Sequence, residues 1–277
     1  MPINKLSINI FLSCLKAKGF EVIFHYDRVH LYATSANNTA KLNRLSDIEG
    51  QQIIIPRALP HNDDMNQMID AHQPDTDYFE RLKNALTGEY VINYAEFAMD
   101  ILVKNKQQVS ELRALLNELL VFERKRCDDR FYHGQYQDTH YFGKRFKHKD
   151  ILVIYSDKKS KIAPGRHCVH MEMRLSGSKI IKDLDVYNIQ DLMSFNHEKF
   201  WDDRLDLRDV NYTKLGRLVT EEKATLTDSS YRRHGQSYFD KHTGSQQLLM
   251  KHPDFVKAFP PIKNRRMFES RLDNALQ

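Results

Sequence analysis

"EYVINYAEFAMDIL", residues 89–102, is the stretch that decides the fold, because its alternate side chains separate into an apolar and a polar row once the chain is extended. The apolar row contains Ala95, Phe97, Met99 and Ile101. The opposite row contains Tyr94, Glu96, Ala98 and Asp100. The pattern therefore predicts a strand with one face in the core and the carboxylates of Glu96 and Asp100 on the other.

Two later stretches, "DILVIYS" (150–156) and "HCVHMEMRLSG" (167–177), divide in the same way. In the later stretch, the row opposite the apolar side chains contains Cys168, His170, Glu172 and Arg174. In the earlier stretch, the row that ends in a tyrosine and an acid contains Ile151, Val153, Tyr155 and Asp157. If the three strands are neighbours with their polar rows on one face, a single site gathers Glu96, Asp100, His170, Glu172 and Tyr155. Carboxylate and imidazole ligands suit Mg²⁺ or Mn²⁺ better than a metal that prefers thiolates.

These features also have simpler interpretations. A tyrosine in a strand is most often a good β-former with a solvated hydroxyl, and alternating Glu and His most often mark a solvated sheet face. His167 and His170 would share one face of a helix and suggest zinc, but on a strand they point to opposite faces.

The rest of the chain predicts helices on both sides of these strands. Before residue 60 we expect a helix over 3–18 that Gly19 ends, and strands over 20–26, 28–34 and 51–56. A turn at Asp27 would join the first two strands, and the polar segment 57–77, with two prolines, predicts a long connection.

The central part contains the clearest helical pattern, "QQVSELRALLNELLVFE" (107–123), which Ser110 or Asn105 is expected to cap. The other expected elements are a short helix over 77–86, a strand over 138–144 and helical segments from about residue 189 onward. This order predicts an α+β fold with a mainly antiparallel central sheet, flanking helices and a helical carboxyl-terminal region.

Composition sets wide limits on the function. The 277 residues include 42 Lys and Arg against 37 Asp and Glu, and a formal net charge of +5 permits a polyanionic partner without requiring one. The three cysteines, Cys14, Cys127 and Cys168, form no CxxC pair, which is typical of reduced cytoplasmic thiols. Because no apolar run approaches the roughly 18 residues that span a bilayer, we expect a cytoplasmic protein with no membrane partner.

Basic residues cluster around the strand that carries Tyr155. The eight Lys and Arg residues of this cluster are Lys144, Arg145, Lys147, Lys149, Lys158, Lys159, Lys161 and Arg166, against two acids, Asp150 and Asp157. A pair of solvated loops would explain them, but they flank the strand on both sides, so a docked polyanion would meet both groups. The predicted DNA-binding residues are Lys144, Arg145, Lys147, Lys149, Lys161 and Arg166 of this cluster, together with Arg174.

At residues 88–210 the sequence resembles rolling-circle replication initiators of the type of the gene II proteins of filamentous phages, and more distantly the initiators of staphylococcal rolling-circle plasmids. The matching motifs are an acidic strand, "INYAEFAMDIL", a strand that ends in tyrosine and basic residues, "DILVIYSDKK", and a glutamate strand, "CVHMEMRL". The resemblance implies an enzyme that nicks one strand of supercoiled origin DNA, keeps the 5′ phosphate on a tyrosine and leaves a 3′ hydroxyl as primer.

The resemblance assigns the nucleophile to Tyr155 and metal ligation to Glu96 and Glu172, whereas Asp100 and His170 are expected as ligands from the strand geometry alone. A phenol with a pKa near 10 needs a metal or cationic neighbours to react as phenolate, and Lys158 or Lys159 would neutralise the phosphate or assist the leaving oxygen. The expected partners are the supercoiled origin duplex and the nicked single strand, with a host helicase and polymerase, and a homodimer on DNA is possible.

The chain is expected to divide into three parts: an amino-terminal half-unit over 1–75 with a possible role in DNA recognition, a catalytic half-unit over 76–210, and a basic, mostly helical region over 211–277. Tyr141, in "THYFGKR", is the alternative nucleophile or a second tyrosine for strand transfer. The sequence departs from the better-known rolling-circle and relaxase superfamily in lacking a strict His-hydrophobic-His metal motif, and this departure counts against the expected carboxylate-rich metal site.

Other functions stay open at this stage. A relaxase of a mobile element would use the same chemistry. A non-catalytic DNA-binding regulator of replication or copy number would use Tyr155 only for packing against sugar or base, and an RNA-binding sheet with exposed aromatic residues is a third alternative.

Overall fold

A computed structural model describes residues 6–34, 52–119, 130–132, 139–142, 149–205, 207–209, 211–214, 216–217, 258 and 260–276. Within these residues, the strands form one eight-stranded sheet in the order β2-β3-β1-β4-β8-β7-β6-β5. Their bounds are β1 Glu21–Ala33, β2 Gln52–Pro56, β3 Gln67–His72, β4 Tyr90–Val103, β5 Arg130–Tyr132, β6 Thr139–Phe142, β7 Asp150–Tyr155 and β8 His167–Ser176. All of the neighbouring pairs are antiparallel, which confirms the predicted α+β class.

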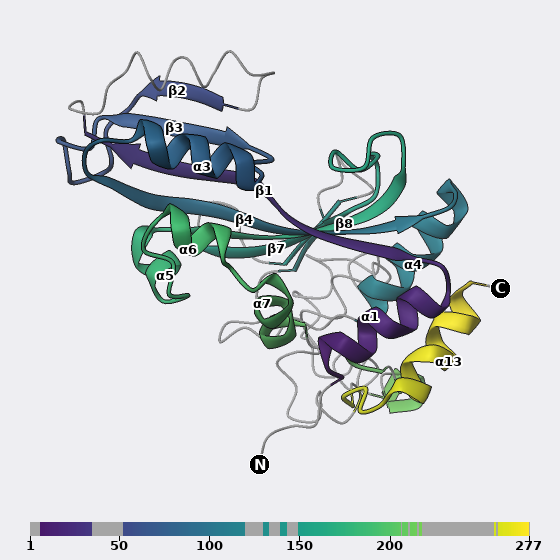
Figure 1. The fold of residues 1–277 in the computed structure, drawn as a ribbon. Coiled ribbons are helices and arrows are strands. Elements are labelled where there is room, and N and C mark those ends of the chain that lie inside the picture. The colour runs from purple at the N-terminus through teal and green to yellow at the C-terminus, as the bar shows by residue number, and fades with distance from the viewer. Residues whose placement is uncertain are drawn as a thin grey trace.

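Helices pack on one face of this sheet. Their bounds are α1 Ile8–Ala17, α3 Thr76–Ala85, α4 Lys106–Leu119, α5 Ser178–Lys182, α6 Ile189–Met193, α7 His197–Arg204 and α13 Arg265–Ala275. Figure 1 shows α1, α4 and α13 grouped at one end of the sheet and α3, α5 and α6 at the other. None of the described helices is long and apolar enough to cross a bilayer.

The apolar rows predicted from the sequence form the core beneath these helices. The core includes Ala95, Phe97, Met99 and Ile101 of β4 and Val169, Met171, Met173 and Leu175 of β8. Leu152 and Ile154 of β7 extend it, so Tyr155 belongs to the opposite row of its strand, as predicted. The polar rows therefore lie on the sheet face opposite the one on which the described helices pack.

Local sequence signals begin and end the helices as predicted. The Asn105 side chain accepts a hydrogen bond from the backbone N–H of Gln108 at 2.9 Å, which identifies Asn105 rather than Ser110 as the cap of α4. Gly19, with φ +78°, follows α1 in the left-handed region that strains other residues.

The expected turn at Asp27 is wrong. Residues 21–33 form one continuous strand, β1, which pairs with β4 along its whole length. The register shifts between Tyr26 and Arg28, so Asp27 is the extra residue of a β-bulge. A bulge and a tight turn both interrupt the alternation of side chains, which explains why the sequence pattern did not distinguish them.

The segment 57–77 is also more ordered than its composition indicates. It contains β3, which pairs with both β1 and β2. Because β1 and β3 precede residue 75 and β4 follows it, the sheet continues through the expected boundary between half-units. The division into half-units stays a prediction.

Candidate active site

The four central strands bring the predicted site residues onto one sheet face. In the register, Asp100 of β4 pairs with His170 of β8, and His170 pairs with Tyr155 of β7. Glu96 pairs with Arg174 four residues away along the same strands. Cross-strand partners point to the same face, so strand alternation alone assembles this group.

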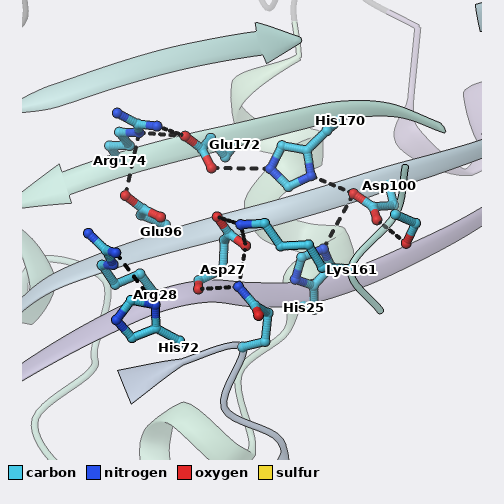
Figure 2. A network of polar contacts seen from close by, with 12 residues as sticks. His25, Asp27, Arg28, His72, Glu96, Asp100, Lys161, His170, Glu172 and Arg174 are labelled. Atoms are coloured by element: carbon cyan, nitrogen blue, oxygen red, sulfur yellow. Dashed lines mark hydrogen bonds and ion pairs between the residues drawn. The ribbon is translucent and has the colours of Figure 1, made fainter. Parts of the chain in front are cut away.

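His170 lies between two carboxylates (Figure 2). Its Nδ1 is 2.5 Å from Asp100 Oδ1 and its Nε2 is 3.1 Å from Glu172 Oε2, and all three side chains are buried. Burial opposes a charge on the imidazole, but the hydrogen bonds to Asp100 and Glu172 outweigh it and raise the pKa of His170 to about 9. His170 is therefore an imidazolium that donates to both carboxylates.

Arg174 joins the two glutamates to which the family resemblance gave the metal. Its Nε donates to Glu172 Oε1 at 2.5 Å and lies 3.4 Å from Glu96 Oε1. Tyr94 donates its hydroxyl hydrogen to the same Glu96 oxygen. Burial first, and then the charge of Glu172, raise the pKa of Glu96 to about 7. Glu96 is thus held by a guanidinium and a phenol rather than beside His170.

Asp27, which the sequence analysis did not select, is the fourth buried carboxylate of the site. Lys161 Nζ donates to both of its oxygens at 2.9 Å, and Gln73 Nε2 donates to Oδ1 at 3.0 Å. Burial opposes the charge, but His170, Lys161 and these hydrogen bonds outweigh it and lower the pKa of Asp27 to about 2. The available signal was an acid between two strand-like runs, 20–26 and 28–34, and its interpretation as a turn concealed it.

Two groups of three side chains bring ligand atoms within 4.8 Å of one another: His25, Asp100 and His170, and Asp27, His170 and Glu172. Both ring nitrogens of His25 are buried without a hydrogen-bond partner among the described residues, and Nε2 is 3.5 Å from Asp100 Oδ1. An imidazole beside carboxylates fits Mn²⁺, and a set of ligands with more oxygen atoms fits Mg²⁺. His170 would have to release a proton to serve as a ligand.

The Tyr155 ring stacks on the His170 ring, with centroids 4.3 Å apart. The sequence led us to expect surroundings that favour the phenolate, but the described residues favour the neutral phenol. Burial first, and then the charge of Glu172, raise the pKa of Tyr155 above its ordinary value. The lysines that follow Tyr155 in sequence, Lys158 and Lys159, have exposed side chains. A cation among the carboxylates would reverse the sign of their effect on the phenol.

The predicted DNA-binding residues separate into two sets. Lys161 and Arg174 neutralise carboxylates of the site. The second set is Lys149 and Arg166, whose side chains are exposed, and Arg166 lies 3.5 Å from Glu21. Those that lie outside the described residues are Lys144, Arg145 and Lys147. The backbone of Tyr141 pairs with Val153 in β6 and β7, and its side chain lies outside the described part of the chain.

A second polar cluster continues along the same face on β1 and β3. Asp70 Oδ1 is 3.2 Å from His30 Nε2, 3.3 Å from His72 Nε2 and 3.4 Å from Arg28 Nε. The His30 ring stacks on Tyr94, with centroids 4.5 Å apart, which connects this cluster to Glu96. The sequence did not reveal this cluster, because β3 lies in the segment 57–77, whose composition is that of a connection.

Comparison with known proteins adds little to this geometry. No family model matches the sequence, and no curated protein matches it. Among solved structures, the chain is similar to one described as a rolling-circle replication initiator protein from Geobacillus stearothermophilus. The identity is 15%, with a TM-score of 0.35, and the match covers 68% of this chain and 88% of the other. A likeness at this level carries no conclusion about activity.

Proposed function

We propose that this chain is a DNA nicking and joining endonuclease that initiates rolling-circle replication, with Tyr155 as nucleophile and Mg²⁺ or Mn²⁺ as cofactor. The observation that carries the proposal is the stacking of Tyr155 on His170, on a sheet face where His170 contacts two buried carboxylates. A nucleophile beside groups able to hold a cation is the arrangement that a metal-assisted phosphoryl transfer requires.

The residues that would hold the ion are His25, Asp27, Asp100, His170 and Glu172. Glu96 would help to position Arg174, with which it forms an ion pair. The ion would supply positive charge that polarises the scissile phosphate and favours the phenolate of Tyr155. Strands β4 and β8 would keep Asp100, His170 and Glu172 in fixed positions, because the core side chains on the opposite face of both strands are buried.

In the proposed reaction, the Tyr155 oxygen attacks the phosphorus and the bond to the 3′ oxygen breaks. The phenolic proton leaves to water or to a site carboxylate, and the 3′ oxygen departs with the bonding electrons and takes up a proton. Lys158 and Lys159 are the proposed donors, since they follow β7 directly and their side chains are exposed. The phosphotyrosine ester conserves the bond energy, so the reverse attack by a 3′ hydroxyl rejoins the strand.

Origin DNA is the proposed partner, held by the exposed basic residues on both sides of β7, with the single strand leaving the site after nicking. A host helicase and polymerase would extend the primer, and a homodimer on DNA stays part of the proposal.

The test is a nicking assay on a supercoiled plasmid that carries the origin of the encoding element, with Mg²⁺, Mn²⁺ or chelator. We expect Tyr155→Phe to abolish the covalent protein–DNA adduct on denaturing gels while origin binding changes little, because only one hydroxyl is lost. Tyr187→Phe is the matched control, since Tyr187 is 57% exposed on another part of the surface. An adduct that survives in Tyr155→Phe and disappears in Tyr141→Phe would move the nucleophile to Tyr141.

A non-catalytic DNA-binding regulator is the second candidate. The raised pKa of the Tyr155 phenol and the pairing of each buried carboxylate with Lys161, His170 or Arg174 favour it, because a purely structural polar network has the same appearance. Wild-type protein that binds the origin but forms no adduct in either metal would establish this candidate.

A further inference from the structure

The loop between β7 and β8, residues 156–166, inserts two consecutive side chains into the candidate site. Ser160 Oγ donates to Asp100 Oδ2 at 2.5 Å, and Lys161 Nζ donates to both oxygens of Asp27 at 2.9 Å. One short segment therefore contacts a carboxylate from each of the two groups that can hold a cation.

The backbone of this loop holds Ser160 more firmly than Lys161. Ser160 is buried, its N–H donates to the carbonyl of Arg166 at 3.0 Å, and its Oγ accepts from the N–H of Ala163 at 2.9 Å. The side chain of Lys161 is 40% exposed, so its long stem leads from the site to solvent. The ammonium can thus leave Asp27 by rotations about its own side-chain bonds while the loop stays anchored.

The ammonium of Lys161 donates to both oxygens of Asp27, a carboxylate that would also be a ligand of a divalent ion. A compact ammonium is a point charge with three donors, so on Asp27 it neutralises the same negative charge as a metal ion does. Like charges in a site of low dielectric repel strongly, which prevents Lys161 and a divalent ion from sharing Asp27 at full strength. Arg174 and His170 neutralise the other carboxylates from β8, where the strand fixes their backbone.

We propose that Lys161 is an exchangeable counter-cation that competes with the divalent metal ion for Asp27. Binding of the ion releases the ammonium to the surface, where it becomes available to a DNA phosphate, so that metal loading is coupled to DNA contact by the β7–β8 loop. This inference rests on the proposed metal-dependent function and adds a residue that regulates the occupancy of the same site.

The first test measures Mn²⁺ affinity of the full-length chain without DNA, by electron paramagnetic resonance of the free ion. We expect Lys161→Met, which removes the charge and keeps much of the stem, to tighten the Kd by about tenfold or more. Lys161→Arg keeps the positive charge, and Lys159→Met removes an exposed neighbouring charge. Both controls should stay within about threefold of wild type. An unchanged Kd in Lys161→Met would overturn the competition while leaving nicking by Tyr155 untouched.

The second test uses the wild-type protein, so it does not depend on the folding of a variant. Amine labelling followed by mass spectrometry compares the reactivity of Lys161 and Lys159 with and without Mn²⁺. We expect labelling of Lys161 to rise several-fold with Mn²⁺ while Lys159 stays constant. Equal labelling of Lys161 in both conditions contradicts the release. If neither the wild-type chain nor any of its variants binds Mn²⁺, the inference and the metal-dependent part of the proposed function fail together.

Discussion

Each carboxylate of the candidate site has a cation beside it, and the partners differ in how easily they can be exchanged. His170 and Arg174 belong to the central strand β8, whereas Lys161 reaches Asp27 from a loop. Among these acids, Glu96 has a raised pKa, because its burial and the charge of Glu172 outweigh the opposite effect of Arg174. Neighbouring acids of one sheet face therefore differ in protonation, which a sequence pattern of alternating acids does not indicate.

The imidazolium of His170 predicts a loss of stability at alkaline pH. Its pKa is raised from 6.5 to about 9 in the folded chain, so its contribution is fully present below pH 6.5 and is lost as the pH rises through 9. Two and a half pKa units correspond to a loss of roughly 3 kcal/mol in the free energy of unfolding. The groups that face His170 are Asp100, Glu172, Asp27, His25 and Tyr155.

Urea unfolding at a series of pH values from 6 to 9.5 measures this loss. His170→Gln should be less stable than wild type at pH 6 and should show a much flatter dependence across the same window. Glu96 also lowers the free energy of unfolding as the pH rises, but over a lower range, since its pKa is raised from 4.5 to about 7. A wild-type curve that is flat between pH 6.5 and 9 would show that His170 is neutral in the folded protein.

At the scale of elements, the strands that carry the site were predictable and their connections were not. Alternation in β4, β7 and β8 separates core from polar rows without reference to any other segment, so the side chains on the site face could be named in advance. The bulge at Asp27 and the strand β3 depend on pairing with β1 and β4, which are distant in sequence. For this reason Asp27, His25 and Lys161 joined the site only when the structure was known.

The carboxyl-terminal helix α13 is predicted to contribute directly to the core. Phe268 is fully buried, and its ring lies 5.3 Å from that of Phe11 in α1. Phe268→Ala should lower the free energy of unfolding by about 3–5 kcal/mol, through lost burial and the cavity that remains. Arg266→Ala, at an exposed position on the same helix, is the control and should change it by less than about 0.5 kcal/mol. Chemical denaturation provides both values, and equal stability of the two variants would mean that α13 is detached in solution.

For the whole molecule, the central question is whether residues 76–210 form an independent catalytic unit. Figure 1 shows β1 running the length of the sheet, and the register places it between β3 and β4. β1 supplies His25 and Asp27 to the candidate site and the fully buried Val29 and Leu31 to the core. Because β1 lies between β3 and β4, it belongs to the same folding unit as both strands and is not part of a separate domain.

A chain that begins at residue 76 is therefore expected not to fold. Without β1, strand β4 would become an open edge with an apolar face. Its buried residue Phe97 would lose the Tyr26 ring of β1, whose centroid lies 5.3 Å away. We expect the fragment 76–277 to lack near-ultraviolet circular dichroism and a cooperative thermal transition, whereas the full chain shows both. The fragment 76–210 should behave in the same way. Cooperative unfolding of either fragment, together with Mn²⁺ binding, would instead establish the half-unit division and remove Asp27 from the essential ligands, because no fragment that starts at residue 76 contains it.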